Sequence, residues 1–129
     1  MERLNDRLLV AERALQTLRE VLNEPESDIV RDAAIKRFEY CFETVWRVAQ
    51  LYLRDQHSLQ RNSPKTVMRA SGQVELLDEG QVELALNMAN DRNLTAHTYN
   101  EALAEEIYSR LPAYARLMEE WLKKMRDAA

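Results

Sequence analysis

The chain has 129 residues, of which two are glycine and three are proline, too few for the many turns of a β-sandwich. Its 46% hydrophobic and 31% charged residues are typical of a mainly helical domain that is large enough to bury a core. The net charge of −4 argues against a general affinity for nucleic acid, because attraction to phosphate requires positive charge.

The sequence is charged from its second residue and has no apolar run of membrane-spanning length, so we expect neither a signal peptide nor a membrane segment. Cys41 is the only cysteine, which excludes an internal disulfide and a thiolate metal cluster. We therefore expect a single domain, residues 1–129, with a cytoplasmic location.

Two long helices are predicted in the first part of the chain. Leucine and alanine recur at spacings of three and four over residues 4–22, and Pro25 cannot continue that helix. Ser27 or Asp28 can cap the next helix, whose apolar positions over residues 35–52 cover a wide face. This pattern indicates a central helix buried on more than one side, with Cys41 as a small core residue.

A loop is predicted over residues 55–64, and we interpret His57 within it as a solvated residue. Ser63 followed by Pro64 predicts the start of a short helix that ends near Gly72.

Two more long helices follow. Asp78 can cap a helix that ends within residues 87–93, and apolar residues spaced by three and four predict a last helix over residues 103–125. Pro112 should kink that last helix. Four long helices and one short one predict an all-α fold, namely an antiparallel up-and-down four-helix bundle with an additional short helix.

Charges are unevenly distributed along the chain. Residues 54–69 hold four bases and one acid, whereas residues 71–91 hold five acids and no base. The basic strip is suited to guiding a polyanion, although a solvated loop explains it equally well. Glu39, Glu43 and Arg47 are spaced four apart and predict ion pairs on the surface of the central helix or at an interface, with Glu43 facing a cleft as the alternative.

The segment "DRNLTAHTYN", residues 91–100, interrupts the helical pattern. On one continuous helix Arg92 and His97 would lie about 140° apart around the axis. Asparagine and threonine favour caps and turns, so we expect Arg92 to close one helix, His97 to precede the next, and the bend to bring them together. Thr98 can open a capping box at the last helix, and Asn100 is the rival cap.

Arginine and histidine at a helix junction are suited to phosphate chemistry. Arginine donates two hydrogen bonds to phosphate oxygens, and histidine exchanges protons near neutral pH. Cleavage of an RNA backbone needs one group to deprotonate the 2′-hydroxyl and another to protonate the leaving oxygen, which favours a second copy of the site in a dimer. One histidine without a suitably spaced Asp/Glu pair predicts no metal site.

A purely structural interpretation of the same residues is also open. In it His97 caps carbonyl groups, Arg92 pairs with an acid such as Asp91, and Tyr99 packs onto the first turn of the last helix as a hydrophobic staple.

The stretch "RNLTAHTY" resembles the Arg-x4-His-x-Tyr signature of HEPN-domain toxins of the HEPN–MNT toxin–antitoxin type, also called nucleotidyltransferase substrate-binding proteins. Residues 31–48, 63–71 and 91–114 resemble the central helix, the short third helix and the last helix of that family, in the same order. The resemblance therefore covers nearly the whole chain.

The resemblance implies a homodimer with a composite active site that cleaves RNA without a metal. His97 would be the acid/base, Arg92 the phosphate clamp and Asn93 the orienting residue, while Tyr99 would accept AMP from ATP in a reaction catalysed by an MNT nucleotidyltransferase antitoxin. The toxin itself would need no cofactor, and ATP and Mg²⁺ would be used by the partner.

Two other functions remain open. One is a non-catalytic subunit that binds a substrate or nucleotide for a two-component nucleotidyltransferase, in which Arg92 and His97 would bind phosphate. The other is a bundle that serves only complex assembly.

Overall fold

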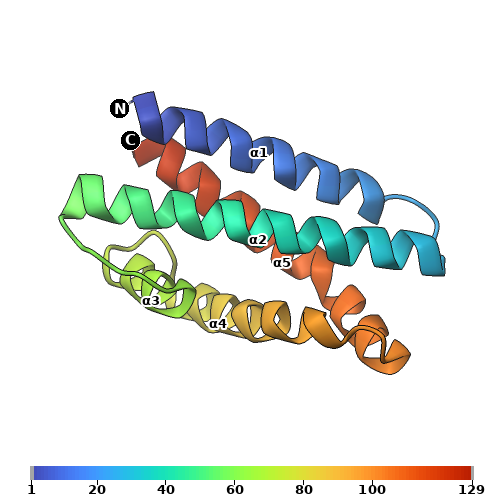
Figure 1. The fold of residues 1–129 in the computed structure, drawn as a ribbon. Helices are drawn as coiled ribbons and strands as arrows, with labels where there is room; N and C mark the ends of the chain where they lie inside the picture. The colour runs from blue at the N-terminus through green and yellow to red at the C-terminus, as the bar shows by residue number, and fades with distance from the viewer. Residues whose placement is uncertain (1, 129) are drawn as a thin grey trace.

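The computed structural model describes residues 2–128, and within them the chain forms five α-helices. These are α1 (Glu2–Leu22), α2 (Asp28–His57), α3 (Pro64–Gln73), α4 (Glu79–Leu94) and α5 (Glu101–Ala128), with a 3-10 turn η1 (Thr95–His97) before α5. Helices α1, α2, α4 and α5 alternate in direction, as Figure 1 shows. The predicted up-and-down bundle with an additional short helix is confirmed.

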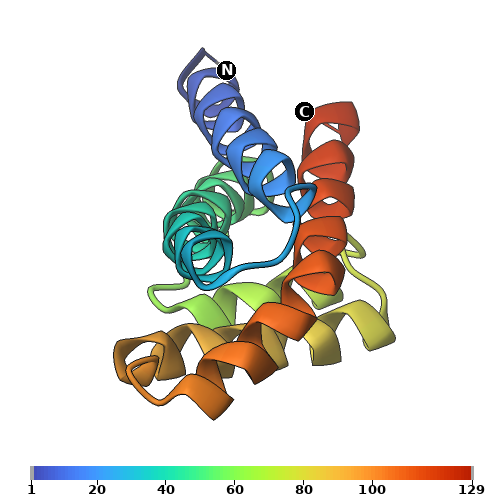
Figure 2. The same cartoon turned by 90° about the vertical axis from the view of Figure 1, so that its right-hand side faces the viewer.

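The helices form two layers. Helices α1, α2 and α5 pack against one another, while α3 and α4 pair and cover the other side of α2 (Figures 1 and 2). The start of α1 and the end of α5 lie at the same end of the bundle. None of the helices within residues 2–128 combines the length and the apolar character needed to cross a membrane.

The core confirms the predicted central position of α2. The fully buried side chains include Phe38 of α2 and Tyr114 and Trp121 of α5. Cys41 has no exposed surface, and burial raises the pKa of its thiol to about 12. It is therefore a core residue, as its place in the apolar pattern predicted.

The predicted helix starts follow from local capping. Ser27 Oγ accepts a hydrogen bond from the amide of Val30 at 3.1 Å. Asp78 and Gln81 form a reciprocal capping box at the start of α4. Pro112 lies within α5, and Figure 2 shows the helix changing direction along its length, in agreement with the predicted kink.

Helix α2 extends to His57, which lies in the predicted loop but belongs to the last turn of the helix. Ser58 ends the helix in the left-handed conformation, with φ 55° and ψ 32°, and its amide donates to the carbonyl of Arg54. Glycine is the usual residue at this position because it has no Cβ. The His57 side chain is exposed, as predicted, and its ring lies near the ring of Tyr52.

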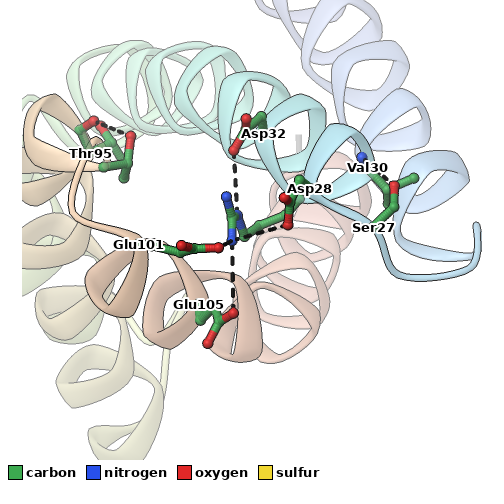
Figure 3. A network of polar contacts seen from close by, with 9 residues as sticks. Ser27, Asp28, Val30, Asp32, Thr95, Glu101 and Glu105 are labelled. Atoms are coloured by element: carbon green, nitrogen blue, oxygen red, sulfur yellow. Dashed lines mark hydrogen bonds and ion pairs between the residues drawn. The ribbon is translucent and has the colours of Figure 1, made fainter.

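A buried arginine joins the start of α2 to the start of α5. Arg31 is 8% exposed, and its guanidinium lies 3.4–3.8 Å from carboxylate oxygens of Asp28, Asp32, Glu101 and Glu105, as Figure 3 shows. Two of these acids belong to α2 and two to α5. The network therefore fixes the first turns of α5, which directly follow the segment with the signature residues.

Candidate functional site

Between α4 and α5 the chain makes the turn η1 and three further residues before α5 begins. Asn100 caps α5, because its Oδ1 accepts from the amide of Leu103 at 3.1 Å. The capping box expected at Thr98 is not formed, since the Thr98 hydroxyl donates to the carbonyl of Thr95 instead. The rival cap, Asn100, was the correct prediction.

Arg92 lies in the last turn of α4, as predicted, and is held from two sides. Its Nη1 lies 3.3 Å from Glu39 Oε2 and donates to Thr95 Oγ1 at 3.1 Å. The Thr95 hydroxyl lies 3.0 Å from Glu39 Oε2 and 2.7 Å from the Arg92 carbonyl, and its single proton serves one of these two acceptors. Glu39 of α2 thus binds both the guanidinium and the turn that follows it.

The predicted ion pairs along α2 are not formed among the described residues. Glu39 pairs with Arg92, and Glu43 Oε2 accepts from Trp46 Nε1 at 3.3 Å. The Arg47 guanidinium stacks over the Trp46 ring, 4.1 Å from its centre. The spacing of four does place the three side chains on one face of α2. Their partners are different, however: Glu39 pairs with a residue of another helix, and Glu43 and Arg47 contact the buried Trp46.

Arg92 and Asn93 line a hollow of about 430 Å³ between α2, α3 and α4. We call it the Arg92 hollow. Its other lining residues are Phe42, Glu43, Ser63, Pro64, Lys65 and Ala89. The place of Glu43 in the cleft of the expected dimer stays a prediction, but its side chain lines this hollow beside Arg92. Cations, an amide and a carboxylate meet there, which is a suitable chemical environment for a polar substrate.

His97 and Tyr99 lie outside this hollow, at the surface. Both are exposed, Tyr99 by 86%, and their rings meet edge to face with centroids 6.0 Å apart. A hydrophobic staple would bury Tyr99 against α5, so that structural alternative is wrong. The phenol of Tyr99 is accessible to another macromolecule.

That the bend brings Arg92 and His97 to one small group stays a prediction, and within residues 2–128 the two side chains contact different neighbours. No hydrogen bond or ion pair links the two side chains within this part of the chain, because Arg92 turns to Glu39 and His97 turns to Tyr99. The signature residues thus comprise Arg92 and Asn93 in the hollow and the exposed His97–Tyr99 pair.

Asp91 has a different partner from the one suggested by the structural interpretation. It is 6% exposed, and its carboxylate receives two hydrogen bonds from Arg110, at 2.6 and 3.0 Å. It also accepts from the hydroxyl of Tyr114 at 2.5 Å, and burial, followed by this hydrogen bond, raises the pKa of Tyr114. The network connects the last turn of α4 to α5 and so positions Arg92.

Glu39, Thr95 and Arg110 were not among the predicted site residues. Two of their contacts span long stretches of sequence, such as the 56 positions that separate Thr95 from Glu39. The sequence contains only a weak indication of these residues, namely an acid on the central helix and a threonine three positions after an arginine.

The sequence matches the family model described as "Nucleotidyltransferase substrate binding protein like" over residues 6–127. No curated protein matches the chain.

Solved structures share this fold. A protein from Thermus thermophilus is 52% identical, with a TM-score of 0.87 over 90% of this chain and 98% of its own. A tri-AMPylated HEPN toxin from Shewanella oneidensis, in complex with an MNT antitoxin, is 15% identical, with a TM-score of 0.78 over 96% of each chain.

A Haemophilus influenzae protein, described as a substrate-binding domain of a nucleotidyltransferase, is 20% identical, with a TM-score of 0.74 over 92% of this chain and 98% of its own. The resemblance noted in the sequence is thereby confirmed. The chain belongs to the nucleotidyltransferase substrate-binding protein family, and its fold is that of the HEPN toxins.

Proposed function

We propose that this protein is a metal-independent endoribonuclease toxin of a HEPN–MNT pair, neutralised by transfer of AMP to Tyr99. The observation that carries the proposal is the exposure of the Tyr99 phenol directly beside the His97 ring. A modifying enzyme can reach this hydroxyl, and a group attached to it would lie on the tyrosine whose ring meets that of the histidine.

The proposed cleavage uses the 2′-hydroxyl of RNA as the nucleophile. A base removes its proton, the 2′-oxygen bonds to phosphorus, and the bond from phosphorus to the 5′-oxygen breaks as an acid protonates that oxygen. His97 takes the base and acid roles from two copies of the chain, which form a homodimer with a composite site. Arg92 stabilises the charge that develops on the phosphate, and Asn93 orients the substrate.

In the proposed neutralisation the oxygen of Tyr99 attacks the α-phosphorus of ATP, which is bound with Mg²⁺ by the partner nucleotidyltransferase. Pyrophosphate leaves, and the phenolic proton passes to a base. The attached phosphate then carries negative charge beside His97, where it competes for Arg92 and repels RNA.

A growth assay tests this assignment. Induction of the wild type should arrest growth, whereas Arg92→Ala and His97→Ala should not. Co-expression of the nucleotidyltransferase should restore growth to the wild type but not to Tyr99→Phe, with AMP detected on Tyr99 by mass spectrometry.

The chain offers matched controls for two of these variants. His57→Ala removes the other exposed histidine, which also lies near a tyrosine ring, and Tyr40→Phe removes another exposed tyrosine hydroxyl. Both should behave like the wild type. Arrest that persists in His97→Ala would eliminate the proposed acid/base.

The second candidate is the non-catalytic subunit of a two-component nucleotidyltransferase. It is favoured by the family description and by the Haemophilus influenzae relative. In that case His97→Gln should retain ligand binding and no variant should alter growth. A stable monomer at micromolar concentration in light scattering would contradict the composite site.

A further inference from the structure

A second hollow, of about 360 Å³, lies where α1, the C-terminal half of α2 and the following loop meet. Its lining contains five arginines, Arg3 and Arg7 of α1, Arg47 and Arg54 of α2, and Arg61 of the loop, and it contains no acidic residue. We call it the arginine pocket. The basic strip recognised in the sequence supplies only Arg54 and Arg61, and the fold adds the other three.

Most of this positive charge is not neutralised within the described part of the chain. Arg54 lies 3.3 Å from the carboxylate of Asp55. Arg3, Arg7, Arg47 and Arg61 form no ion pair with a described carboxylate. Five like charges around one hollow repel one another, and an anion in the pocket relieves that repulsion.

Internal contacts hold the pocket in shape. Gln50 Nε2 donates to the carbonyl of Arg61 at 2.7 Å, which fastens the loop to α2. Arg47 is stacked on Trp46, a side chain that is only 4% exposed. The guanidinium of Arg47 and the backbone of Arg61 are therefore placed before any ligand arrives, which lowers the entropy cost of binding.

The arginine pocket is continuous with the candidate site. Arg7 and Arg47 also line a small neighbouring hollow together with Glu43. Glu43 in turn lines the Arg92 hollow with Arg92 and Asn93. The three hollows therefore follow one another over the surface of α2.

Of the α2 side chains that line these hollows, those at positions 43, 47, 50 and 54 lie on one stripe of the helix, and Glu39, which lines none of them, precedes Glu43 by one turn on the same stripe. From Glu39, the partner of Arg92, to Arg54 the stripe extends about 22 Å along the axis. That length fits a few nucleotides of an extended strand.

We propose that the arginine pocket binds backbone phosphates of single-stranded RNA beside the bond that is cleaved. The proposal rests on the proposed function, since it places the flanking part of the same substrate. Arginine matches the geometry of phosphate oxygens with two parallel donors, and all five basic residues of the pocket are arginine. Because the pocket is concave and lies in line with the Arg92 hollow, it fits an extended RNA strand better than the flat surface of an acidic protein.

Binding of a 2′-O-methyl single-stranded RNA, measured by fluorescence anisotropy, tests the proposal. This probe lacks the hydroxyl nucleophile, so binding is separated from cleavage. Arg7→Gln/Arg61→Gln removes two pocket charges from two elements. Arg116→Gln/Lys124→Gln removes two exposed charges of α5 that line none of the three hollows.

The pocket variant should bind up to about 25-fold more weakly at 0.1 M salt, and its plot of log K against log salt should be shallower by about 1.4. The control variant should bind like the wild type. Arg3→Gln/Arg54→Gln should reproduce the loss, and thermal unfolding should show that both pocket variants remain folded.

Equal RNA affinity of the pocket and control variants overturns the proposal, even if the wild type cleaves RNA. Loss of the complex with the nucleotidyltransferase at unchanged RNA affinity also overturns it, and would make the pocket a docking surface for an acidic protein. If the wild type does not cleave RNA but its RNA affinity falls in the pocket variants, the proposed role of the pocket is supported and the proposed function is refuted.

Discussion

The carboxylate of Asp91 joins α4 to α5, and its replacement by asparagine tests what holds Arg92 in position. Asp91 accepts hydrogen bonds from Arg110 at 2.6 and 3.0 Å and from the Tyr114 hydroxyl at 2.5 Å. An asparagine has the same shape, but its amide nitrogen replaces one acceptor and its neutrality removes the counter-ion of Arg110.

The expected cost follows from the exposure of the pair. Removing one partner of a fully buried ion pair costs about 3–5 kcal/mol. The Arg110 side chain is 42% exposed, so water screens part of the loss, and we expect about 2–3 kcal/mol. With an entropy of unfolding of about 0.27 kcal/mol per kelvin for 129 residues, Tm should fall by about 7–11 K.

Circular dichroism during heating measures this fall, with Asp6→Asn as the control for an exposed aspartate of α1. Asp91→Asn, Tyr114→Phe and the double variant form a mutant cycle, in which we expect a coupling free energy of at least about 1 kcal/mol. A fall in Tm of less than about 3 K together with additive effects would refute the claim that this network fixes the end of α4.

Three further predictions concern single residues. Glu39→Gln removes the counter-ion of Arg92 and should slow RNA cleavage by between about 10- and 100-fold at nearly unchanged Tm, whereas cleavage at the wild-type rate would show that Glu39 does not position the guanidinium. Burial raises the pKa of Cys41 from 9.0 to about 12, so the native thiol keeps a proton that the unfolded chain releases. Stability should therefore fall by up to about 1.4 kcal/mol per pH unit from pH 9 to 12, and urea titrations should show a shallower fall in Cys41→Ala. Ser58→Gly relieves a left-handed residue with φ 55° and should raise the free energy of unfolding by about 0.5–1 kcal/mol in urea titrations, and a decrease would contradict this.

Features encoded within a few residues were predictable from the sequence. Ser27 and Asp78 cap their helices because the acceptor and the amide that it binds are three positions apart. The apolar spacing likewise identified α2 as the central helix, and the proline within the last helix predicted a bend, which Figure 2 shows along α5.

Contacts between distant parts of the chain were not predictable in this way. The partner of Arg92 is Glu39 on another helix, and the arginine pocket combines Arg3 and Arg7 with residues of α2 and its loop. Neither periodicity nor spacing specifies how two helices face each other, since that depends on the packing of the whole core. The local signature thus indicated the candidate functional residues, whereas the contacts that hold them required the fold.

The bend in α5 divides that helix into two parts. Proline has no amide hydrogen, so the carbonyl of Tyr108 lacks its usual helical partner at Pro112. The part after the bend carries Trp121 and Met125 in the core, and the part before it buries Ile107 and Leu111 and directly follows the His97–Tyr99 pair. Because both parts are anchored, amide hydrogen exchange should show high protection on each side of the bend, with the amides next to Pro112 exchanging first. The surface presented to a partner is therefore held in place by the core of the bundle.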